Sequence, residues 1–247
     1  MKSKITIKTI QNLLIKGFQT IYVDDDTSRR MWWASLEVIQ KEFLAHNCQQ
    51  GGIWVASPLP ALNDKKFFNQ LRGWLWSPEG FPYFQKENAG FLPVNHAVKI
   101  KNDFDFISNY KVLNLSPKDG YEPFLMIITP NFQCILTIVG EKDKKTLLMK
   151  CDKDSLKVAI ELVHTKLNQE NYDEGVEFRN SINNLGELNM NVQFEKNFWP
   201  ILSGKLAKLG PNQNIQNFVK IDKKNEQINE AKLLSAISHE VRTPLAT

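Results

Sequence analysis

The chain has 247 residues, of which 42% are hydrophobic and 11% aromatic, with a formal net charge of +4. This composition excludes a disordered or fibrous protein, and the length allows one large or two small domains with a buried core. The charge surplus is small and scattered rather than gathered in a basic stripe, so we predict no nucleic-acid partner.

The cysteines and the apolar runs exclude further classes of protein. Cys48, Cys134 and Cys151 are far apart and form no Cys-x-x-Cys pair, which predicts reduced thiols and neither a disulfide framework nor a metal site. The longest apolar run, Phe124–Ile128, is much shorter than the ~20 residues that a membrane span needs. The N-terminus lacks the apolar core of a signal peptide. We therefore predict a cytoplasmic protein without a membrane span.

The first part of the chain predicts helices around one short strand. Apolar residues at helical spacing predict a helix over residues 5–18 that ends near Gly17. Asp24, Asp25 and Asp26 are interpreted as the start of a helix that runs to about His46, in preference to a metal cluster. Residues 53–56 predict a strand, and Asn63–Asp64 precede another expected helix.

The most aromatic stretch of the chain covers residues 73–84, where proline and glycine predict irregular structure. Its aromatic side chains either cover the core of a small domain, which we favour, or line a pocket for a flat ligand or a partner. Arg72 beside them is expected at the surface, with an anionic ligand as the alternative partner. The aromatic residues in question are Trp74, Trp76, Phe81, Tyr83 and Phe84.

The middle of the chain predicts an antiparallel meander with a covering helix. Residues 85–123 are polar and turn-rich, whereas 124–129, 132–139 and 146–150 have the apolar, β-branched character of strands with short links. Asp152 or Asp154 then caps a helix whose stripe runs from Leu156 to Leu167, with His164 expected at its surface. Residues 168–190 are expected to form a loop, and a helix over 191–209 is expected to kink at Pro200. These elements predict an α+β fold with an antiparallel sheet and covering helices.

Gly210–Pro211 is the strongest predicted boundary, and it divides the chain into three parts. Residues 1–210 form the first domain, 211–230 a linker helix, and 231–247 the start of a dimeric helical bundle. Phe218, Ile221, Asn225 and Ile228 alternate steps of three and four residues, as in a parallel coiled coil. The alternative is a single amphipathic helix that docks on the first domain.

The C-terminal octapeptide Ser238-His-Glu-Val-Arg-Thr-Pro-Leu245 resembles the H-box of the dimerisation and phosphoacceptor domain of sensor histidine kinases. The resemblance implies that His239 is the autophosphorylated residue. It also implies that Glu240 assists proton handling and that Thr243 orients a water during dephosphorylation of a response regulator. A histidine with a pKa near ~6.5 suits the role, because much of it is deprotonated at neutral pH. The alternative is a surface histidine near a helix end.

The resemblance extends to cofactors and partners. ATP with Mg²⁺ would be bound by a catalytic domain C-terminal to the H-box, which this sequence does not contain, so we expect the chain alone to be inactive. The implied partners are a second copy of the chain, a response regulator receiver domain, and an intracellular ligand or protein signal. The alternative is a non-catalytic, dimeric signal-binding or phosphorelay module.

The first domain is similar to cyanobacterial DICT-like or GAF-like sensory modules, on the meander-then-helix order at 124–167 and the tryptophan-rich segment before it. Some GAF modules hold a bilin through a cysteine followed by histidine. No cysteine here is followed by histidine, which argues against a covalently bound bilin, and the sequence indicates no other sensor cofactor.

Overall fold

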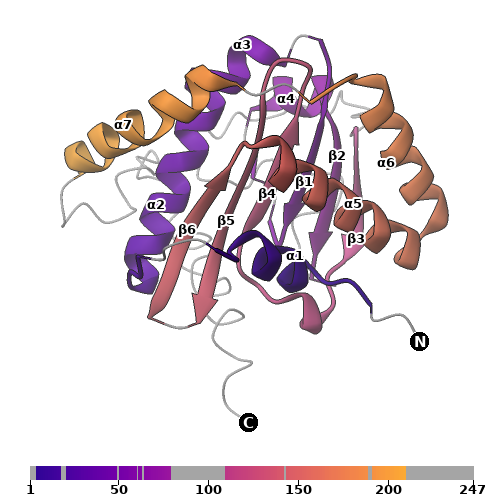
Figure 1. Ribbon diagram of the computed structural model, residues 1–247, viewed down its shortest axis with the longest axis horizontal. Helices are drawn as coiled ribbons and strands as arrows, with labels where there is room; N and C mark the ends of the chain where they lie inside the picture. Colours follow the sequence, from indigo (N-terminus) through magenta and orange to yellow (C-terminus); the bar gives the residue numbers. More distant parts are fainter. Residues whose placement is uncertain are drawn as a thin grey trace, which may run out of the picture. The chain divides into compact units, whose positions relative to one another are not determined.

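The computed structural model (Figure 1) describes residues 4–17, 21–48, 50–59, 61–62, 64–78, 109–141, 143–188 and 191–209. They form a six-stranded sheet in the order β3-β2-β1-β4-β5-β6, with helices packed on both faces. The predicted α+β class is confirmed. The border at Gly210–Pro211 and the expected helical bundle lie outside the described residues.

The helices and strands have the following bounds. The strands are β1 (Ile53–Ser57), β2 (Arg72–Ser77), β3 (Tyr110–Asn114), β4 (Phe124–Ile128), β5 (Gln133–Glu141) and β6 (Lys144–Lys150). The helices are α1 (Ile7–Leu14), α2 (Asp25–Val38), α3 (Ala45–Asn47), α4 (Lys65–Gln70), α5 (Lys153–Glu170), α6 (Tyr172–Asn184) and α7 (Val192–Leu209). A π-helix, η1 (Ile39–Leu44), continues α2 into α3, and a 3₁₀ turn, η3 (Pro117–Asp119), precedes β4.

The sheet is mixed rather than antiparallel throughout. β4, β5 and β6 form the predicted antiparallel meander, and β1 pairs antiparallel with β4. β1, β2 and β3 run parallel to one another. A parallel pair needs a crossover connection, and α4 lies in the crossover between β1 and β2.

The prediction of irregular structure at residues 73–84 is wrong for residues 73–77, which belong to the buried strand β2. The missing side chain of Gly73 allows the ring of Trp54 to pack closely against the strand. It lies opposite Trp54 in the β1–β2 register, and a Cβ on Gly73 would come within 2.3 Å of the Trp54 ring. Phe81, Tyr83 and Phe84 lie outside the described residues.

The loop predicted over residues 168–190 is also wrong, because α5 extends to Glu170 and α6 follows at once. Asn171 ends one helix and begins the next: its backbone N–H bonds to the Leu167 carbonyl, and its side chain accepts from the N–H groups of Asp173 and Glu174. An asparagine in a polar segment therefore acts as an N-cap here.

The predicted helix starts are confirmed where the structure describes them. The carboxylates of Asp24, Asp64 and Asp152 accept from backbone N–H groups in the first turns of α2, α4 and α5. The described residues include no cluster of three metal-ligating side chains. Pro200 lies inside α7 without ending it.

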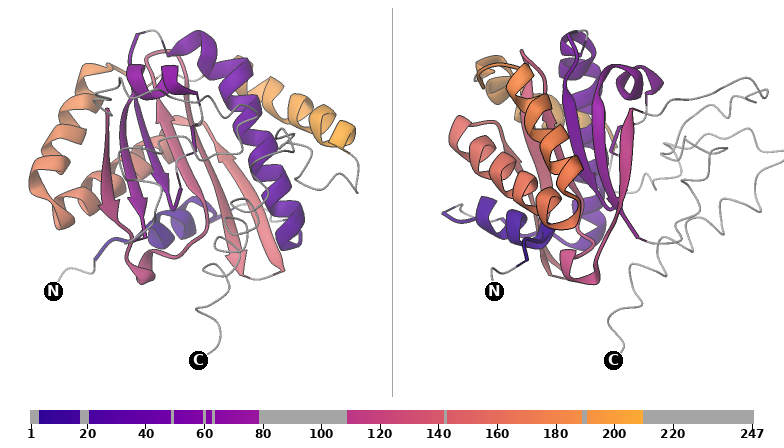
Figure 2. Two further views of the ribbon diagram at one scale, coloured as in Figure 1. Left: turned by 180° about the vertical axis from the view of Figure 1, so that it is seen from behind. Right: turned by 90° about the vertical axis from the view of Figure 1, so that its right-hand side faces the viewer.

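Alternating strand residues build a separate core on each face of the sheet. Trp54, Leu75 and Leu125 point to the face covered by α2, α4 and α7. Val55, Trp74 and Met126 point to the face covered by α1, α5 and α6. Figure 2 shows these three helices stacked on one side of the strands in its right-hand view. In the described part of the chain, no helix is both long and apolar enough to cross a membrane.

Candidate functional site

The residues of the predicted phosphoacceptor site, His239, Glu240 and Thr243, lie outside the described part of the chain, as does the seam at 218–228. Within the described part, a network of polar contacts links β2 to the two helices α5 and α6. This network is the candidate site of the described residues.

Three side chains on one face of β2 pair with three carboxylates along α5 and α6. Alternation along the strand points residues 72, 74 and 76 to the same side. The Trp76 indole N–H donates to Glu170 over 2.7 Å, and the Trp74 indole N–H donates to Glu174 over 2.9 Å. We call the three pairs the β2–α6 ladder: Arg72–Glu177 (3.0 Å between charged atoms), Trp74–Glu174 and Trp76–Glu170.

The ladder decides between the two interpretations of the aromatic stretch for the residues described. Trp74 and Trp76 are fully buried and their indole N–H groups already have carboxylate partners, so these two tryptophans belong to the core. Arg72 is half-exposed and pairs with Glu177, which confirms its surface position. The pocket interpretation fails for these two rings, because neither is open to a flat ligand.

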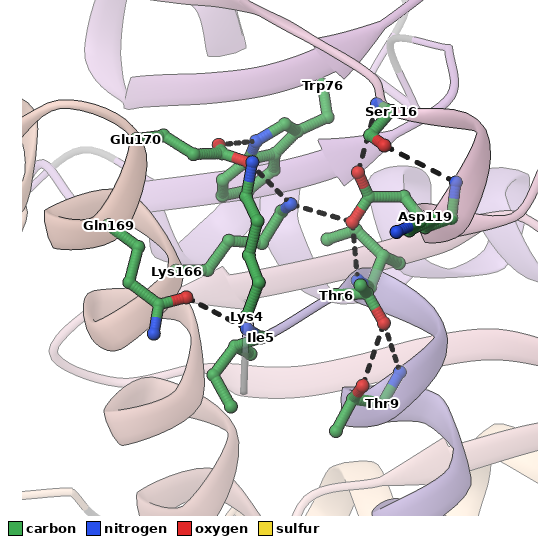
Figure 3. A network of polar contacts seen from close by, with 12 residues as sticks. Lys4, Ile5, Thr6, Thr9, Trp76, Ser116, Asp119, Lys166, Gln169 and Glu170 are labelled. Carbon is green, nitrogen blue, oxygen red and sulfur yellow. Dashed lines mark hydrogen bonds and ion pairs between the residues drawn. The ribbon is translucent and has the colours of Figure 1, made fainter. Parts of the chain in front are cut away.

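A buried ionic cluster continues the ladder at the end of β2 (Figure 3). The Lys166 ammonium lies 2.7 Å from an Asp119 carboxylate oxygen and 2.8 Å from a Glu170 oxygen. It also lies 5.2 Å from the Trp76 ring centroid. Lys166 and Asp119 side chains are each 1% exposed. Ions so buried are stable only when every charge has close partners, so these groups depend on one another.

The residues before and at the start of α1 close over this cluster. The Ile7 N–H donates to Asp119 over 2.9 Å, and the Ile5 N–H donates to Gln169 over 2.8 Å. The Lys4 ammonium lies 3.9 Å from Glu170. The Ser116 N–H donates to the second Asp119 oxygen over 3.0 Å. The cluster thus ties the N-terminal residues, η3 and α5 to the sheet, as Figure 3 shows.

Sequence reasoning missed Lys166, although a signal was present. Lys166 falls in the apolar stripe of α5, three residues after Val163 and directly before Leu167, both of which are buried. A lysine within a stripe that otherwise faces the core predicts a buried charge with an acidic partner. Asp119 is more than 40 residues away along the chain, so the partner could not be found by local spacing.

A second ionic cluster surrounds Lys145 on β6. Its ammonium contacts Asp25 of α2 and lies 2.9 Å from a Glu122 oxygen. Burial alone would lower the pKa of Lys145, but its bonds to Asp25 and Glu122 raise it. Burial also raises the pKa of Glu122, against the opposing effect of Lys145. This cluster fastens the start of α2 to the edge strand.

His164 bridges α5 and α6 rather than lying free at the surface. Arg179 lies 2.9 Å from its Nδ1, and the Asn168 amide lies 2.9 Å from its Nε2. Arg179 also binds both oxygens of Glu161 at 2.6 Å. Burial and the neighbouring Arg179 lower the pKa of His164. An arginine can only donate, so its contact with Nδ1 favours the neutral ring, in agreement with the lowered pKa.

All three cysteines are free thiols, and all three are buried. Burial raises the pKa of each, well above the ordinary range for Cys134 and to about 11 for Cys151. They are protonated at neutral pH and are not the activated thiolates of a catalytic centre.

The β2–α6 ladder and the Lys166 cluster have the chemistry of structural contacts that hold helices on the sheet. Their carboxylates and cations are occupied by one another, and the cluster lies beneath the N-terminal residues. A catalytic site requires a group that can reach a substrate, and a paired, buried charge cannot. The arrangement can hold α1, α5 and α6 in one position on the sheet, and it can resist or report their movement.

Residues 8–211 match a protein family described as a domain of unknown function, DUF8628. The chain belongs to this family. All six strands, and every helix from α2 to α7, lie within the DUF8628 match. No curated protein and no solved structure matches the chain. The description of the DUF8628 family assigns no activity, so the function has to be argued from the residues themselves.

Proposed function

We propose that the chain is the sensory and phosphoacceptor portion of a cytoplasmic two-component sensor histidine kinase, with the DUF8628 domain as its input domain. The observation that carries the proposal is the octapeptide Ser238–Leu245, in which Glu240 and Thr243 follow His239 at the spacing of the H-box. His239 would accept a phosphoryl group from ATP and Mg²⁺ held by a kinase catalytic domain, and pass it to an aspartate of a response regulator.

The residue types of the octapeptide suit this transfer. Phosphoryl transfer asks the protein mainly for positioning and charge stabilisation, and a neutral imidazole supplies the nucleophile. The Glu240 carboxylate can take up the proton that leaves the ring. Pro244 lacks a backbone donor and disfavours continued helix, which would set the end of a regular helical stretch close to the phosphoacceptor.

Two further observations support an input role for the part before the octapeptide. The DUF8628 match ends at residue 211, beside the Gly210–Pro211 boundary expected from the sequence. The ionic groups of the Lys166 cluster are closed off from substrate, which favours a conformational role over catalysis. The seam of Phe218, Ile221, Asn225 and Ile228 supports dimerisation through the following residues.

Phosphorylation in trans tests the phosphoacceptor. The chain is incubated with radiolabelled ATP, Mg²⁺ and a histidine kinase catalytic domain, and we expect an acid-labile, base-stable label. His239→Gln should abolish the label, whereas His164→Gln, the matched control, should retain it. A label that persists in His239→Gln would refute the assignment of His239. A chain that dimerises but takes no label with several catalytic domains would instead indicate the non-catalytic signal-binding module.

The dimer is tested separately by the mass in solution. We expect the full chain to be a dimer and a variant that lacks residues 212–247 to be a monomer. Monomers in both cases would contradict a dimeric phosphoacceptor helix.

A further inference from the structure

Two of the three cysteines occupy facing positions on adjacent strands. Cys134 belongs to β5, and Cys151 follows the last residue of β6. The β5–β6 register pairs Ile135 with Lys150, and one further step in each strand brings Cys134 opposite Cys151. Both side chains belong to the core on the α7 face of the sheet, so they point the same way.

The hydrogen-bond pattern shows which kind of pair this is. The Ile138 N–H donates to the Pro123 carbonyl over 3.1 Å, and the Thr129 N–H donates to Phe132, so the even-numbered residues of β5 direct their backbone groups toward β4. Cys134 is therefore at a non-hydrogen-bonded position of the β5–β6 pairing. Such pairs bring Cα atoms to about 4.5 Å. That spacing lies within the roughly 4.4–6.8 Å that a disulfide bridges.

The first turn of α7 packs against the residues that lead into Cys134. Phe194 packs edge-on against Phe132, two residues before Cys134, with ring centroids 4.9 Å apart. Asn191 caps this turn and donates its amide to the Asn131 carbonyl over 3.2 Å. Cys134 is fully buried and Cys151 is 6% exposed, so Cys151 is the thiol that a small reagent reaches first.

We propose that Cys134 and Cys151 form a dithiol modification site, which a small hydroperoxide converts into a cross-strand disulfide. The Cys151 thiolate attacks the peroxide: the O–O bond breaks, an S–O bond forms, and Cys151 becomes a sulfenic acid while hydroxide leaves. The Cys134 sulfur then attacks the Cys151 sulfur: an S–S bond forms, the S–O bond of the sulfenic acid breaks, and its hydroxyl leaves as water with the proton of the Cys134 thiol. In total two thiols are oxidised by two electrons and one hydrogen peroxide is reduced to two waters.

We expect the oxidation of Cys134 and Cys151 to be slow in the resting fold. The raised pKa values of both thiols keep the thiolate fraction low at neutral pH, and the Cys151 thiolate is also disfavoured by the negative charges of Glu195 and Asp152. Movement of the first turn of α7 would raise the rate, because it withdraws the negative charge of Glu195 from Cys151. The oxidation step does not depend on the proposed kinase function and can be tested without it.

Cys48 provides a matched internal control. Its thiol donates to Gln70 over 2.8 Å, and it lies on neither β5 nor β6. Whereas Cys134 faces a second thiol that can complete a disulfide, Cys48 has the side-chain amide of Gln70 as its partner.

The test is a disulfide map of the folded, full chain. The chain is treated with hydrogen peroxide at pH 8, unfolded, alkylated with iodoacetamide, and analysed by intact mass and non-reducing peptide mapping. We expect the loss of two hydrogens, a linked peptide pair that contains Cys134 and Cys151, and an alkylated Cys48. Cys48→Ala should leave the linked pair unchanged, and Cys134→Ala should leave a Cys151 sulfenic acid that dimedone traps.

Two results would overturn the proposal. One is that the folded wild-type chain keeps all three thiols alkylatable after peroxide treatment, although the same treatment oxidises the chain in urea. The other is a disulfide that includes Cys48. Both are read from the wild-type chain, so they hold even if a cysteine variant fails to fold.

Discussion

Lys166 of α5 and Asp119 of η3 lie 2.7 Å apart, and each side chain is only 1% exposed. The two residues come from elements that sequence spacing does not connect, and the same Asp119 oxygen also receives the Ile7 N–H. One buried ion pair therefore joins three separate segments, and the removal of either charge leaves the other without a solvent shell.

We expect Lys166→Met to destabilise the fold by about 3–5 kcal/mol, because it leaves Asp119 as a buried charge without its cation. The double variant Lys166→Met/Asp119→Asn should recover part of this loss, since it removes the buried negative charge of Asp119 and leaves only Glu170 without its lysine. Lys157→Met is the control, because Lys157 is an exposed lysine of the same helix, and it should change stability by less than about 0.5 kcal/mol. Urea unfolding followed by circular dichroism measures all three; equal effects of Lys166→Met and Lys157→Met would refute the buried pair.

The β2–α6 ladder predicts a cost for loss of a single indole N–H. Trp76→Phe keeps an aromatic ring in the core but removes the donor to Glu170, so we expect a loss of about 1.5–3 kcal/mol, the range for a hydrogen bond to a charged group. Trp199→Phe is the control: Trp199 is 40% exposed, and its loss should cost less than about 0.5 kcal/mol. A Trp76→Phe variant as stable as the control would show that Glu170 does not depend on this bond.

Two helical glycines should respond to alanine in opposite directions. At Gly175 in α6, a Cβ would lie 1.9 Å from the Asn168 side-chain oxygen and 3.0 Å from the Asn168 backbone nitrogen, so we expect Gly175→Ala to cost about 1–3 kcal/mol. At Gly204 in α7, no atom lies within 4 Å of such a Cβ, so we expect Gly204→Ala to stabilise by about 0.5–1 kcal/mol. The thermal midpoints of the two variants should shift in opposite directions; a shared direction would contradict the close packing of α5 and α6.

The bridge at His164 predicts a dependence of stability on pH. Burial and Arg179 lower the pKa of His164 in the fold below the 6.5 of the unfolded chain. The unfolded chain then binds more protons, so the free energy of unfolding decreases as the pH falls from above 6.5 through the lowered pKa. His164→Gln should remove this component, while the component from Glu161 and Arg179 remains at lower pH. Urea titrations of both proteins between pH 5 and 8 give the difference, and identical curves would contradict the bridge.

Peroxide oxidation of the Cys134–Cys151 pair should accelerate with pH. The pKa of Cys151 is about 11, so between pH 7 and 9 its thiolate fraction grows by about tenfold per pH unit. We expect the rate of disulfide formation, measured by quenched mass spectrometry, to follow that slope. A rate independent of pH would mean that opening of α7, rather than ionisation of the thiol, limits the reaction.

Sequence patterns predicted the elements whose causes are local. Helix starts at Asp24, Asp64 and Asp152 depend on a carboxylate within three residues of the N–H group that it accepts. The meander of β4, β5 and β6 depends on short links between apolar runs. Both kinds of evidence lie within a few residues, so the sequence alone was sufficient.

The failures concern partners that are distant in sequence. The sequence predicts irregular structure at Gly73, because nothing nearby in the chain reveals that the Trp54 ring lies against it. The parallel pairing of β2 with β1 and β3 likewise depends on a crossover, and the Lys166 cluster depends on Asp119. The phosphoacceptor residues His239, Glu240 and Thr243 remain predictions from the octapeptide.

The β2–α6 ladder also makes the fluorescence of two tryptophans sensitive to the position of α5 and α6. An indole's emission responds to the charge and the hydrogen bond at its N–H group, and Trp74 and Trp76 each direct that group at a carboxylate of the α5–α6 pair. If an input signal shifts these helices on the sheet, the native fluorescence should change without any attached dye. A screen of candidate signals therefore needs only the unmodified chain, with Trp76→Phe to show which ring responds.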